Sequence, residues 1–407
     1  MALHERRPSS EKHGGTAAEP RVEGAVAPGF EAVREAFADN LRARGELGAA
    51  FAVTLDGQPV VDLWGGLADG ERGRPWQADT LQVIFSGTKG LVALCLLMLA
   101  DREALDLDAP VARYWPEFAA AGKGAIRVSD VASHQAGLPA LREPVTTDEI
   151  LDGRRMAELL AAQPVEPDRR AAYAYHPLTF GWLCGELIRR VDGREVGRFL
   201  AEEVAAPLGL EVWIGLPPRL EGRVSRLAQS PAWGSRVDEA AVARDELLDR
   251  VRNNPPLFAA GAIPWNAPAW HAAQIPGAGG IATARSLARL YGCLARGGEL
   301  DGVRLLRAET LERGRRLLSR RWDPLGEAEQ AFGVGFELQT AAGQLGPPPD
   351  AFGHRGAGGS VHCAWPSLRI GLSYAMNLMR DDDAVDPRAA ALLEATHRAA
   401  ARLAEGS

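Results

Sequence analysis

Apolar residues near the start of the chain follow first a helical and then a strand-like spacing. Between Phe30 and Leu41, four of them lie three or four positions apart, which puts them on one face of an amphipathic helix. Two runs rich in β-formers follow at residues 49–55 and 59–63, joined by the turn dipeptide at 56–57. The pattern predicts a helix and then a β-hairpin.

The middle of the chain favours helices. Residues 91–100 are apolar on every side and contain neither Gly nor Pro, so we expect a buried helix that begins just after Phe85. From about residue 116 to 275, helical patterns alternate with proline-rich connections. The clearest helical patterns are residues 150–162, 180–191 and 196–206.

Strand-like runs return late in the chain. A glycine-rich segment at 277–280 precedes a helical pattern, and short β-rich runs follow it. The expected elements are a helix at 283–296, strands at 334–338, 361–365 and 370–376, and a final helix at 387–403.

Both chain ends therefore contribute to one sheet, and the predicted fold class is α/β with an inserted all-α lobe, the sheet being flanked by helices. The predicted division is a disordered leader at 1–28, an α/β lobe from 29–115 and 276–407, and a helical lobe at 116–275.

Composition and charge narrow the functional classes. The 407 residues are 46% hydrophobic and 24% charged, which is typical of a globular protein and excludes collagen-like, coiled-coil and disordered chains. The net charge is −7 and no Lys/Arg-rich run is present, so we expect no nucleic-acid partner. The longest apolar stretch is about half of the roughly 20 residues that a membrane helix needs, so we expect no membrane partner.

The leader and the cysteines carry no targeting or metal signal. Residues 1–28 are polar and lack the apolar core of a signal peptide, which favours a cytoplasmic location. The four cysteines lie far apart among apolar neighbours, so we expect buried reduced thiols. The acidic run at 381–383 is interpreted as a solvated turn, and we expect neither a metal nor a cofactor.

The tetrapeptide Ser86-Gly-Thr-Lys89 is the sharpest chemical motif. On a helix, three-residue spacing puts both side chains on one face. A serine hydroxyl needs an adjacent base to become a nucleophile, and burial can lower the pKa of a lysine far enough to provide one. The alternative is a helix cap with Lys89 extended to solvent. Lysine occurs only at positions 12, 89 and 123, and Lys89 alone enters an apolar helix, which favours the catalytic role.

Two further clusters could join this site. Tyr173 and Tyr175 precede a helix, and a phenol near an ammonium group can lose its proton below its usual pKa and act as a base. Alternatively they pack at the helix entrance. The glycine-rich segment 353–360 contains His354, which could face a ligand that approaches the backbone closely. Alternatively it is only a turn between strands.

Together the three motifs resemble one family. Ser86-x-x-Lys89, Tyr175 about ninety residues later and His354-x-Gly356 near the end have the order and spacing of the serine β-lactamase and D,D-peptidase superfamily. The chain is most similar within it to the family VIII carboxylesterases, which are related to class C β-lactamases. Supporting segments are residues 133–139, 207–209 and 279–283, and the resemblance spans roughly residues 30–403.

The resemblance implies a β-lactamase/D,D-peptidase-like fold, in which an antiparallel sheet is flanked by helices and the site lies in the cleft between the lobes. It also implies a role for each motif residue. The implied oxyanion donors are backbone N–H groups. The implied catalytic residues are Ser86 as acylated nucleophile with Lys89 and Tyr175 as the proton-transfer pair; His354, Gly356 and Ala357 would line the substrate, and the N–H groups of Ser86 and Ala357 would form the oxyanion hole.

Two departures from the family pattern bear on the substrate. The usual Tyr-x-Asn motif reads Tyr175-His176-Pro177, so the amide side chain is missing, and Tyr173 remains an alternative base. His354 stands where β-lactamases usually carry lysine, which removes a permanent cation for a substrate carboxylate. Both departures argue against β-lactams as substrates.

The leading hypothesis is therefore a serine hydrolase that cleaves carboxylic esters through acyl-Ser86, with a small-molecule ester or acyl donor as its partner. Transfer of the acyl group to an alcohol or amine is the alternative. β-Lactamase or D-aminopeptidase activity and a non-catalytic ligand binder are less favoured, and the oligomeric state is left open. Five tryptophans suggest an aromatic-lined cleft or a core: Trp182, Trp213, Trp233, Trp265 and Trp270.

Overall fold

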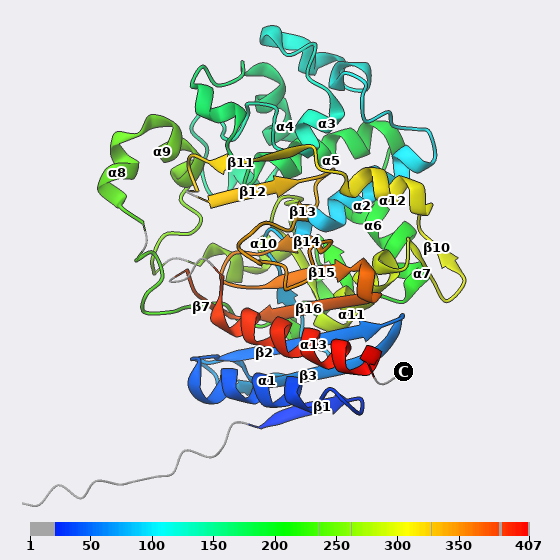
Figure 1. The fold of residues 1–407 in the computed structure, drawn as a ribbon. Helices are drawn as coiled ribbons and strands as arrows, with labels where there is room; N and C mark the ends of the chain where they lie inside the picture. Colours follow the sequence, from blue (N-terminus) through cyan, green and yellow to red (C-terminus); the bar gives the residue numbers. More distant parts are fainter. Residues whose placement is uncertain (1–20, 236, 262, 327, 382–384, 406–407) are drawn as a thin grey trace, which may run out of the picture.

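A large antiparallel sheet organises the molecule (Figure 1). The computed structural model describes residues 21–405 except 236, 262, 327 and 382–384. Within these residues, ten strands form the sheet in the order β1-β3-β2-β16-β15-β14-β13-β12-β11, with β4 paired to β3. Their bounds are β1 (Val22–Val26), β2 (Gly48–Leu55), β3 (Gln58–Asp69), β4 (Arg74–Pro75), β11 (Ser319–Asp323), β12 (Ala328–Phe332), β13 (Glu337–Leu338), β14 (Phe352–Arg355), β15 (Val361–Trp365) and β16 (Ile370–Met376).

The two chain ends meet at the centre of this sheet. Strand β16 pairs with β2 over its whole length, from Ile370 opposite Leu55 to Met376 opposite Ala49. Strands β2 and β3 form the predicted hairpin, and both turn residues, Asp56 and Gly57, have positive φ, as a tight hairpin turn requires. The predicted antiparallel α/β fold class is confirmed.

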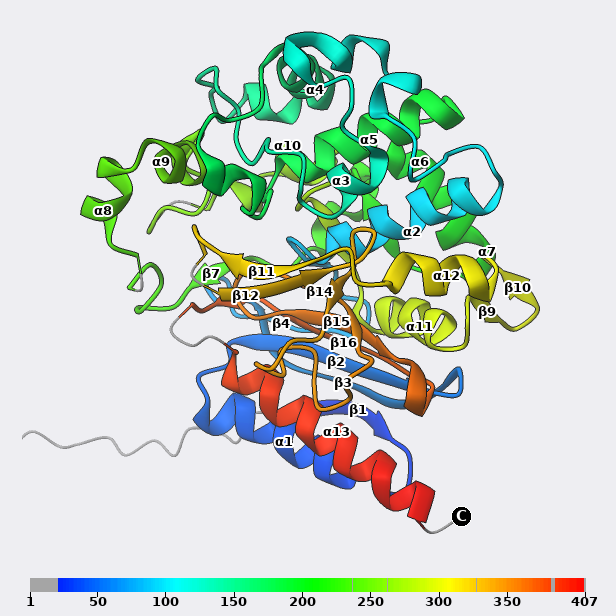
Figure 2. The ribbon, with the colours of Figure 1, turned by 45° about the horizontal axis from the view of Figure 1, so that its top comes forward.

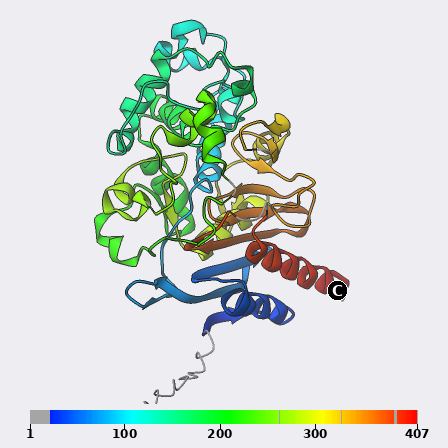
Figure 3. The same cartoon turned by 90° about the vertical axis from the view of Figure 1, so that its left-hand side faces the viewer.

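Helices cover both faces of the sheet, as the edge-on view in Figure 3 shows. Helices α1 (Glu31–Ala43) and α13 (Pro387–Glu405) bury their apolar sides against one face. Helix α11 (Ala284–Ala295) packs on the other, where a Cβ on Gly371 would lie 1.9 Å from the backbone nitrogen of Gly292. Glycine at position 371 therefore permits close contact between α11 and β16.

The remaining helices gather beyond the sheet, above it in Figure 2. Helix α2 (Thr88–Asp101) is buried along nearly its whole length, as its uniformly apolar sequence predicts. A π-helical turn at Ala201–Ala205 joins α6 to α7. The other helices are α3 (Val128–Ala132), α4 (Gly153–Ala162), α5 (Thr179–Asp192), α6 (Val196–Leu200), α7 (Ala206–Leu208), α8 (Glu239–Arg244), α9 (Glu246–Asn253), α10 (Pro268–Ala272) and α12 (Ala308–Arg315).

A small second sheet joins the two parts of the molecule. Strand β8 (Gly280–Ala282) lies between β5 (Gln82–Val83) and β6 (Val212–Ile214), which come from well-separated segments. Two further pairs are short: β9 (Glu299–Leu300) with β10 (Val303–Arg304), and β7 (Ala228–Gln229) with β17 (Leu378–Met379).

The structure differs from the sequence-based prediction at several strands. Residues 22–26 were expected in the disordered leader but form β1, because their backbone pairs with β3. Residues 1–20 of that leader lie outside the described part. Strand β6 falls within the predicted helical lobe, and the predicted strand at 334–338 shortens to 337–338. The limits of the two lobes at 115/116 and 275/276 stay a prediction.

The four cysteines agree with the sequence-based prediction. Each cysteine is buried with a free thiol, as expected. In the described part of the chain, no helix combines the length and the apolar character that crossing a membrane would require.

Candidate active site

Ser86 lies at a sharp turn where β5 leads into α2. The preceding residue, Phe85, has a left-handed φ of 45°, a conformation that a bulky side chain rarely adopts. Its ring is held by Phe258 and Trp265, whose centroids lie 5.6 and 5.3 Å away. Thr88 fastens the other side of the turn, because its hydroxyl donates to the Phe85 carbonyl and accepts from the Gly280 N–H. The turn leaves Ser86 partly exposed.

Three oxygen atoms surround the buried amine of Lys89. Its Nζ lies 3.0 Å from Ser86 Oγ and 2.7 Å from each of the carbonyl oxygens of Pro177 and Gly277. Gly277 approaches because α5 carries a glycine at 181, where a Cβ would lie 1.9 Å from the Gly277 nitrogen. Three separate segments thus converge on one side chain.

Burial makes Lys89 a suitable base. Desolvation lowers its pKa well below the usual value, against a smaller opposing effect of Cys184 and Glu337. A neutral amine has two N–H donors and one lone pair. The Pro177 and Gly277 carbonyls take both donors, so the lone pair faces Ser86 Oγ and can accept its proton. The alternative expectation, a lysine extended to solvent, is wrong, since Lys89 is fully buried.

Tyr175, and not Tyr173, joins Ser86 and Lys89. Lys89 Nζ lies 4.8 Å from the centroid of the Tyr175 ring, and Tyr175 is hydrogen-bonded to Ser86. Tyr173 is 53% exposed and packs its ring against the guanidinium of Arg321, 5.1 Å away. Burial raises the pKa of Tyr175, so the expected low-pKa phenol is not found. A neutral lysine beside a neutral tyrosine is the favoured resting state.

His354 faces the hydroxyl of Tyr175. Burial lowers the pKa of His354 to about 4, despite the opposing effect of Glu337, so the ring is neutral near pH 7. Its Nδ1–H donates to the Arg355 carbonyl at 2.7 Å, which leaves the Nε2 lone pair 3.5 Å from Tyr175 Oη. His354 thus offers the site a hydrogen-bond acceptor and no charge.

The turn after β14 supplies the second predicted oxyanion donor. The Gly359 N–H donates to the Gly356 carbonyl at 3.3 Å, and the Gly356 N–H donates to the Ser360 carbonyl at 2.9 Å. A Cβ on Gly356 would lie 2.3 Å from the Ile84 carbonyl oxygen, so this turn packs directly against the segment that carries Ser86. Among the hydrogen bonds of the described residues, none has the N–H of Ser86 or of Ala357 as its donor. Both groups are available to a ligand.

The chain also matches known proteins over most of its length. The family model described as Beta-lactamase matches residues 33–395, a span that includes every residue of the site above. The chain belongs to the beta-lactamase family. Among its family relatives, "Esterase/beta-lactamase LipL" of Mycobacterium tuberculosis (strain ATCC 25618 / H37Rv) is 39% identical over 385 residues, which are 89% of this chain and 84% of the relative.

Two solved structures extend the likeness of this beta-lactamase family member. A family VIII carboxylesterase is 40% identical with a TM-score of 0.84, covering 93% of this chain and all of its own. A penicillin-binding-protein homologue from Caulobacter crescentus is 38% identical with a TM-score of 0.83, at the same coverage of both chains. The predicted family is confirmed.

Two histidines that the sequence analysis did not single out hold Tyr175 in this beta-lactamase-family site. His134, at a left-handed φ of 61°, accepts the backbone N–H of His176 on its Nδ1 at 3.1 Å, and its ring lies 4.5 Å from that of Tyr175. His176 donates through Nδ1 to the Ala174 carbonyl and accepts the Leu138 N–H on Nε2. Their sequence signal was present only as part of the resemblance, for His134 in the 133–139 segment and for His176 in the motif Tyr175-His176-Pro177.

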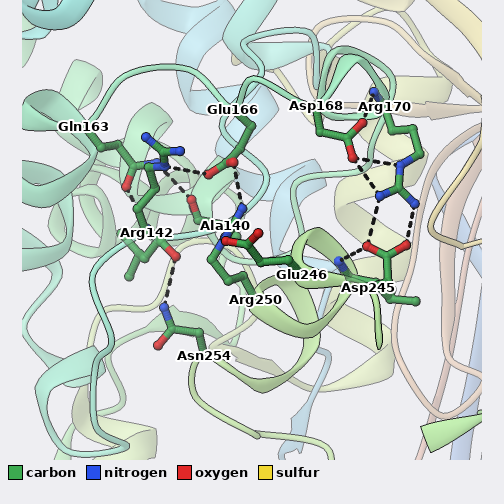
Figure 4. A network of polar contacts seen from close by, with 12 residues as sticks. Ala140, Arg142, Gln163, Glu166, Asp168, Arg170, Asp245, Glu246, Arg250 and Asn254 are labelled. Atoms are coloured by element: carbon green, nitrogen blue, oxygen red, sulfur yellow. Dashed lines mark hydrogen bonds and ion pairs between the residues drawn. The ribbon is translucent and has the colours of Figure 1, made fainter. Parts of the chain in front are cut away.

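Ion pairs fix the loop that leads into Tyr175 to helix α9 in this family member (Figure 4). The buried carboxylate of Glu166 accepts from Arg250 Nη2 at 2.8 Å. Arg170 donates two hydrogen bonds to Asp245, of 2.5 and 2.9 Å. This bidentate pair is the geometry in which arginine binds a carboxylate most specifically.

Most of the predicted aromatic cleft is core in this beta-lactamase-family fold. Trp182, Trp265 and Trp270 are buried, and the ring of Trp265 packs against that of Phe85, the residue before Ser86. Trp213 and Trp233 are partly buried. Neither of the two interpretations, an aromatic-lined cleft or a core, therefore holds for all five tryptophans. In the described chain no group of His, Cys, Asp and Glu could hold a metal ion, and Asp382 and Asp383 of the acidic run lie outside that part.

Proposed function

We propose that the chain is a serine hydrolase that cleaves carboxylic esters through an acyl-Ser86 intermediate. The observation that carries the proposal is the 3.0 Å contact between Ser86 Oγ and the buried Nζ of Lys89, whose other hydrogen-bonding positions are taken by two carbonyls. This arrangement leaves the hydroxyl one acceptor for its proton, which is what a weak nucleophile needs.

In the acylation step, Lys89 takes the Ser86 proton as Oγ attacks the ester carbonyl carbon. The N–H groups of Ser86 and Ala357 would bind the negative charge that develops on the carbonyl oxygen. The Tyr175 hydroxyl then protonates the leaving alkoxide, and the proton held by Lys89 restores the phenol. Deacylation reverses the sequence, with water as the nucleophile in place of the alcohol.

Features of the site favour uncharged esters. His354 is neutral near pH 7, so it adds no cation for a substrate carboxylate. Pro177 offers only its backbone carbonyl, which is already bonded to Lys89. The relatives named as an esterase/beta-lactamase and a family VIII carboxylesterase support ester cleavage. The proposal does not depend on the cytoplasmic location or on the absence of nucleic-acid and membrane partners, both of which stay predictions. It does not depend on the oligomeric state either.

Intact-mass spectrometry after brief mixing with a short p-nitrophenyl ester tests the proposed function. We expect a mass increase equal to the acyl group, located on the peptide that contains Ser86, and release of the free acid. Addition of a short alcohol separates the alternatives, because hydrolysis still yields mainly acid, whereas an acyltransferase yields mainly the new ester. A penicillin in parallel tests the β-lactam alternative. Absence of any adduct, with no turnover, would contradict the proposal.

Replacing Tyr175 by phenylalanine is expected to lower kcat by about 10²- to 10⁴-fold, because the hydroxyl that protonates the leaving group is lost. Tyr173→Phe is the matched control, and its kcat should stay within about twofold of wild type, since the ring is mostly exposed and lies away from Ser86. Steady-state kinetics with esters of alcohols of increasing pKa should show the largest Tyr175→Phe defect for the poorest leaving group. Equal defects in both variants would contradict this assignment.

A further inference from the structure

A buried arginine of the last helix contacts the turn that carries Ala357. Arg388, in α13, has a fully buried side chain. Its Nη2 donates to the carbonyl of Gly358 at 3.1 Å and to that of Leu378 at 3.0 Å. The Gly358 carbonyl also accepts the N–H of Arg380 at 3.1 Å. The carbonyl of the residue next to the proposed oxyanion donor is therefore held by two hydrogen bonds, one of them from the C-terminal helix.

Two buried carboxylates complete the shell around this guanidinium. Arg388 Nη1 lies 3.0 Å from Glu46 Oε1, and Nη2 lies 2.7 Å from Asp386 Oδ2. Tyr374 donates its hydroxyl to the second oxygen of Glu46. All three nitrogens of the guanidinium thus donate to fixed partners, which restricts the orientation of Arg388.

The turn fits this cluster closely. Gly358 and Gly359 have positive φ values of 86° and 118°. A Cβ on Gly359 would lie 2.1 Å from Asp386 Oδ2, so the carboxylate that binds Arg388 also touches the turn. Because the backbone of this turn packs closely on the buried ion cluster around Arg388, the turn is held in a single position.

The direction of the Ala357 N–H follows from the same turn. The Gly356 carbonyl belongs to the peptide unit that carries this N–H, and it points at the Gly359 N–H. Because the two polar groups of a trans peptide point in opposite directions, the Ala357 N–H points away from the turn interior. The Gly356 backbone itself lies against Ile84, two residues before Ser86.

We propose that Arg388 is a positioning residue for the oxyanion hole: by binding the Gly358 carbonyl it holds the 356–359 turn so that the Ala357 N–H can stabilise charge on the substrate oxygen. This inference rests on the proposed acyl-Ser86 chemistry and deepens it. Through Arg388, residues of the C-terminal helix that do not touch the substrate thereby contribute to the function of the active site.

Arg388→Lys is the first test variant, because it keeps the cation but cannot reach Glu46, Asp386 and Gly358 together. The double variant Glu46→Gln/Arg388→Gln, which buries no unpaired charge at either position, serves if the first fails to fold. Lys123→Met is the matched control. Lys123 is also a fully buried cation that donates to backbone carbonyls, those of Ala120, Ala161 and Gln163, but it lies apart from Ser86.

The readout is the ratio of kcat/KM for an ester to that for its thionoester, whose sulfur is a poor acceptor in an oxyanion hole. We expect Arg388→Lys to lower kcat for the ester by about 10- to 100-fold, with KM within about threefold, and to lower the ester-to-thionoester ratio by about tenfold or more. Thermal unfolding and circular dichroism check the fold. Lys123→Met should lose stability and keep the wild-type ratio.

Wild-type kinetics in Arg388→Lys, or equal losses for both substrates, would overturn this inference while leaving the ester hydrolase intact. Equal losses would assign Arg388 a general structural role. A wild-type protein that forms no acyl adduct in the mass-spectrometric experiment and turns over no ester would overturn the proposed function and this inference with it. The two failures are therefore distinguishable.

Discussion

Replacing Ser86 by alanine is expected to lower kcat for ester hydrolysis by about 10⁶-fold and to abolish the acyl adduct. Without Oγ there is no nucleophile, and water is not held at its position. The fold should persist, because Ser86 is partly exposed and Lys89 keeps its bonds to the carbonyls of Pro177 and Gly277. Initial rates with a p-nitrophenyl ester and intact-mass spectra of wild type and variant measure the effect.

The matched control for this experiment is Ser367→Ala. Ser367 lies on the turn between β15 and β16, and its hydroxyl donates to Asp350, so its loss should leave rate and labelling unchanged. A fluorophosphonate applied to all three proteins should label wild type and Ser367→Ala alone. Undiminished turnover or labelling in Ser86→Ala would refute Ser86 as the nucleophile.

Replacing Lys89 by methionine is expected to lower kcat/KM by about 10²- to 10⁴-fold, because the base that activates Ser86 is removed. Lys89→Arg should be as inactive, since a guanidinium stays protonated and has no lone pair to offer. Comparing Lys89→Met with Lys89→Arg distinguishes a role of Lys89 as a base from a role as a positive charge. Lys123→Met, which removes the other fully buried lysine, should keep wild-type kcat/KM.

The pH dependence of both activity and stability follows from the lowered pKa of Lys89. Wild-type kcat/KM should rise with pH as Lys89 loses its proton, and this limb should vanish in Lys89→Met. The unfolded chain binds the lysine proton up to the usual pKa while the folded protein has released it, so this group makes stability rise with pH between the two values. This rise of stability with pH should be smaller in Lys89→Met, whatever stability the variant loses by leaving the Pro177 and Gly277 carbonyls unpaired. Thermal unfolding at several pH values measures it, and an unchanged pH dependence would contradict a neutral buried amine.

Local periodicity was sufficient to predict much of the framework. The helix at 31–43, the hairpin at 56–57 and the strands at 361–365 and 370–376 have patterns set by neighbours in sequence. The contact between Ser86 and Lys89 was also predictable from local sequence, because it depends only on their three-residue spacing at the start of one helix.

Contacts between distant segments were beyond the reach of such patterns. The choice between Tyr175 and Tyr173 depends on burial, which tertiary packing decides. The carbonyls of Pro177 and Gly277 carry no side-chain signal, and burial of Lys123 was not foreseen, because its nearest neighbours in sequence are alanines and glycines and form no run of large apolar residues. Strand β1 was missed for a related reason, since it is a segment of 5 residues that becomes a strand through its pairing with β3.

Because β2 pairs with β16, the main sheet cannot close until the C-terminal part of the chain has been synthesised. At about 5–20 residues per second, roughly 15–60 s of translation separate the emergence of these two strands from the ribosome. Throughout that interval one edge of the β2–β3 hairpin has no partner, and its apolar residues, which the finished protein buries, are open to aggregation or chaperone binding. Sheet closure, and with it the docking of α13, is therefore a late and slow event governed by chain topology.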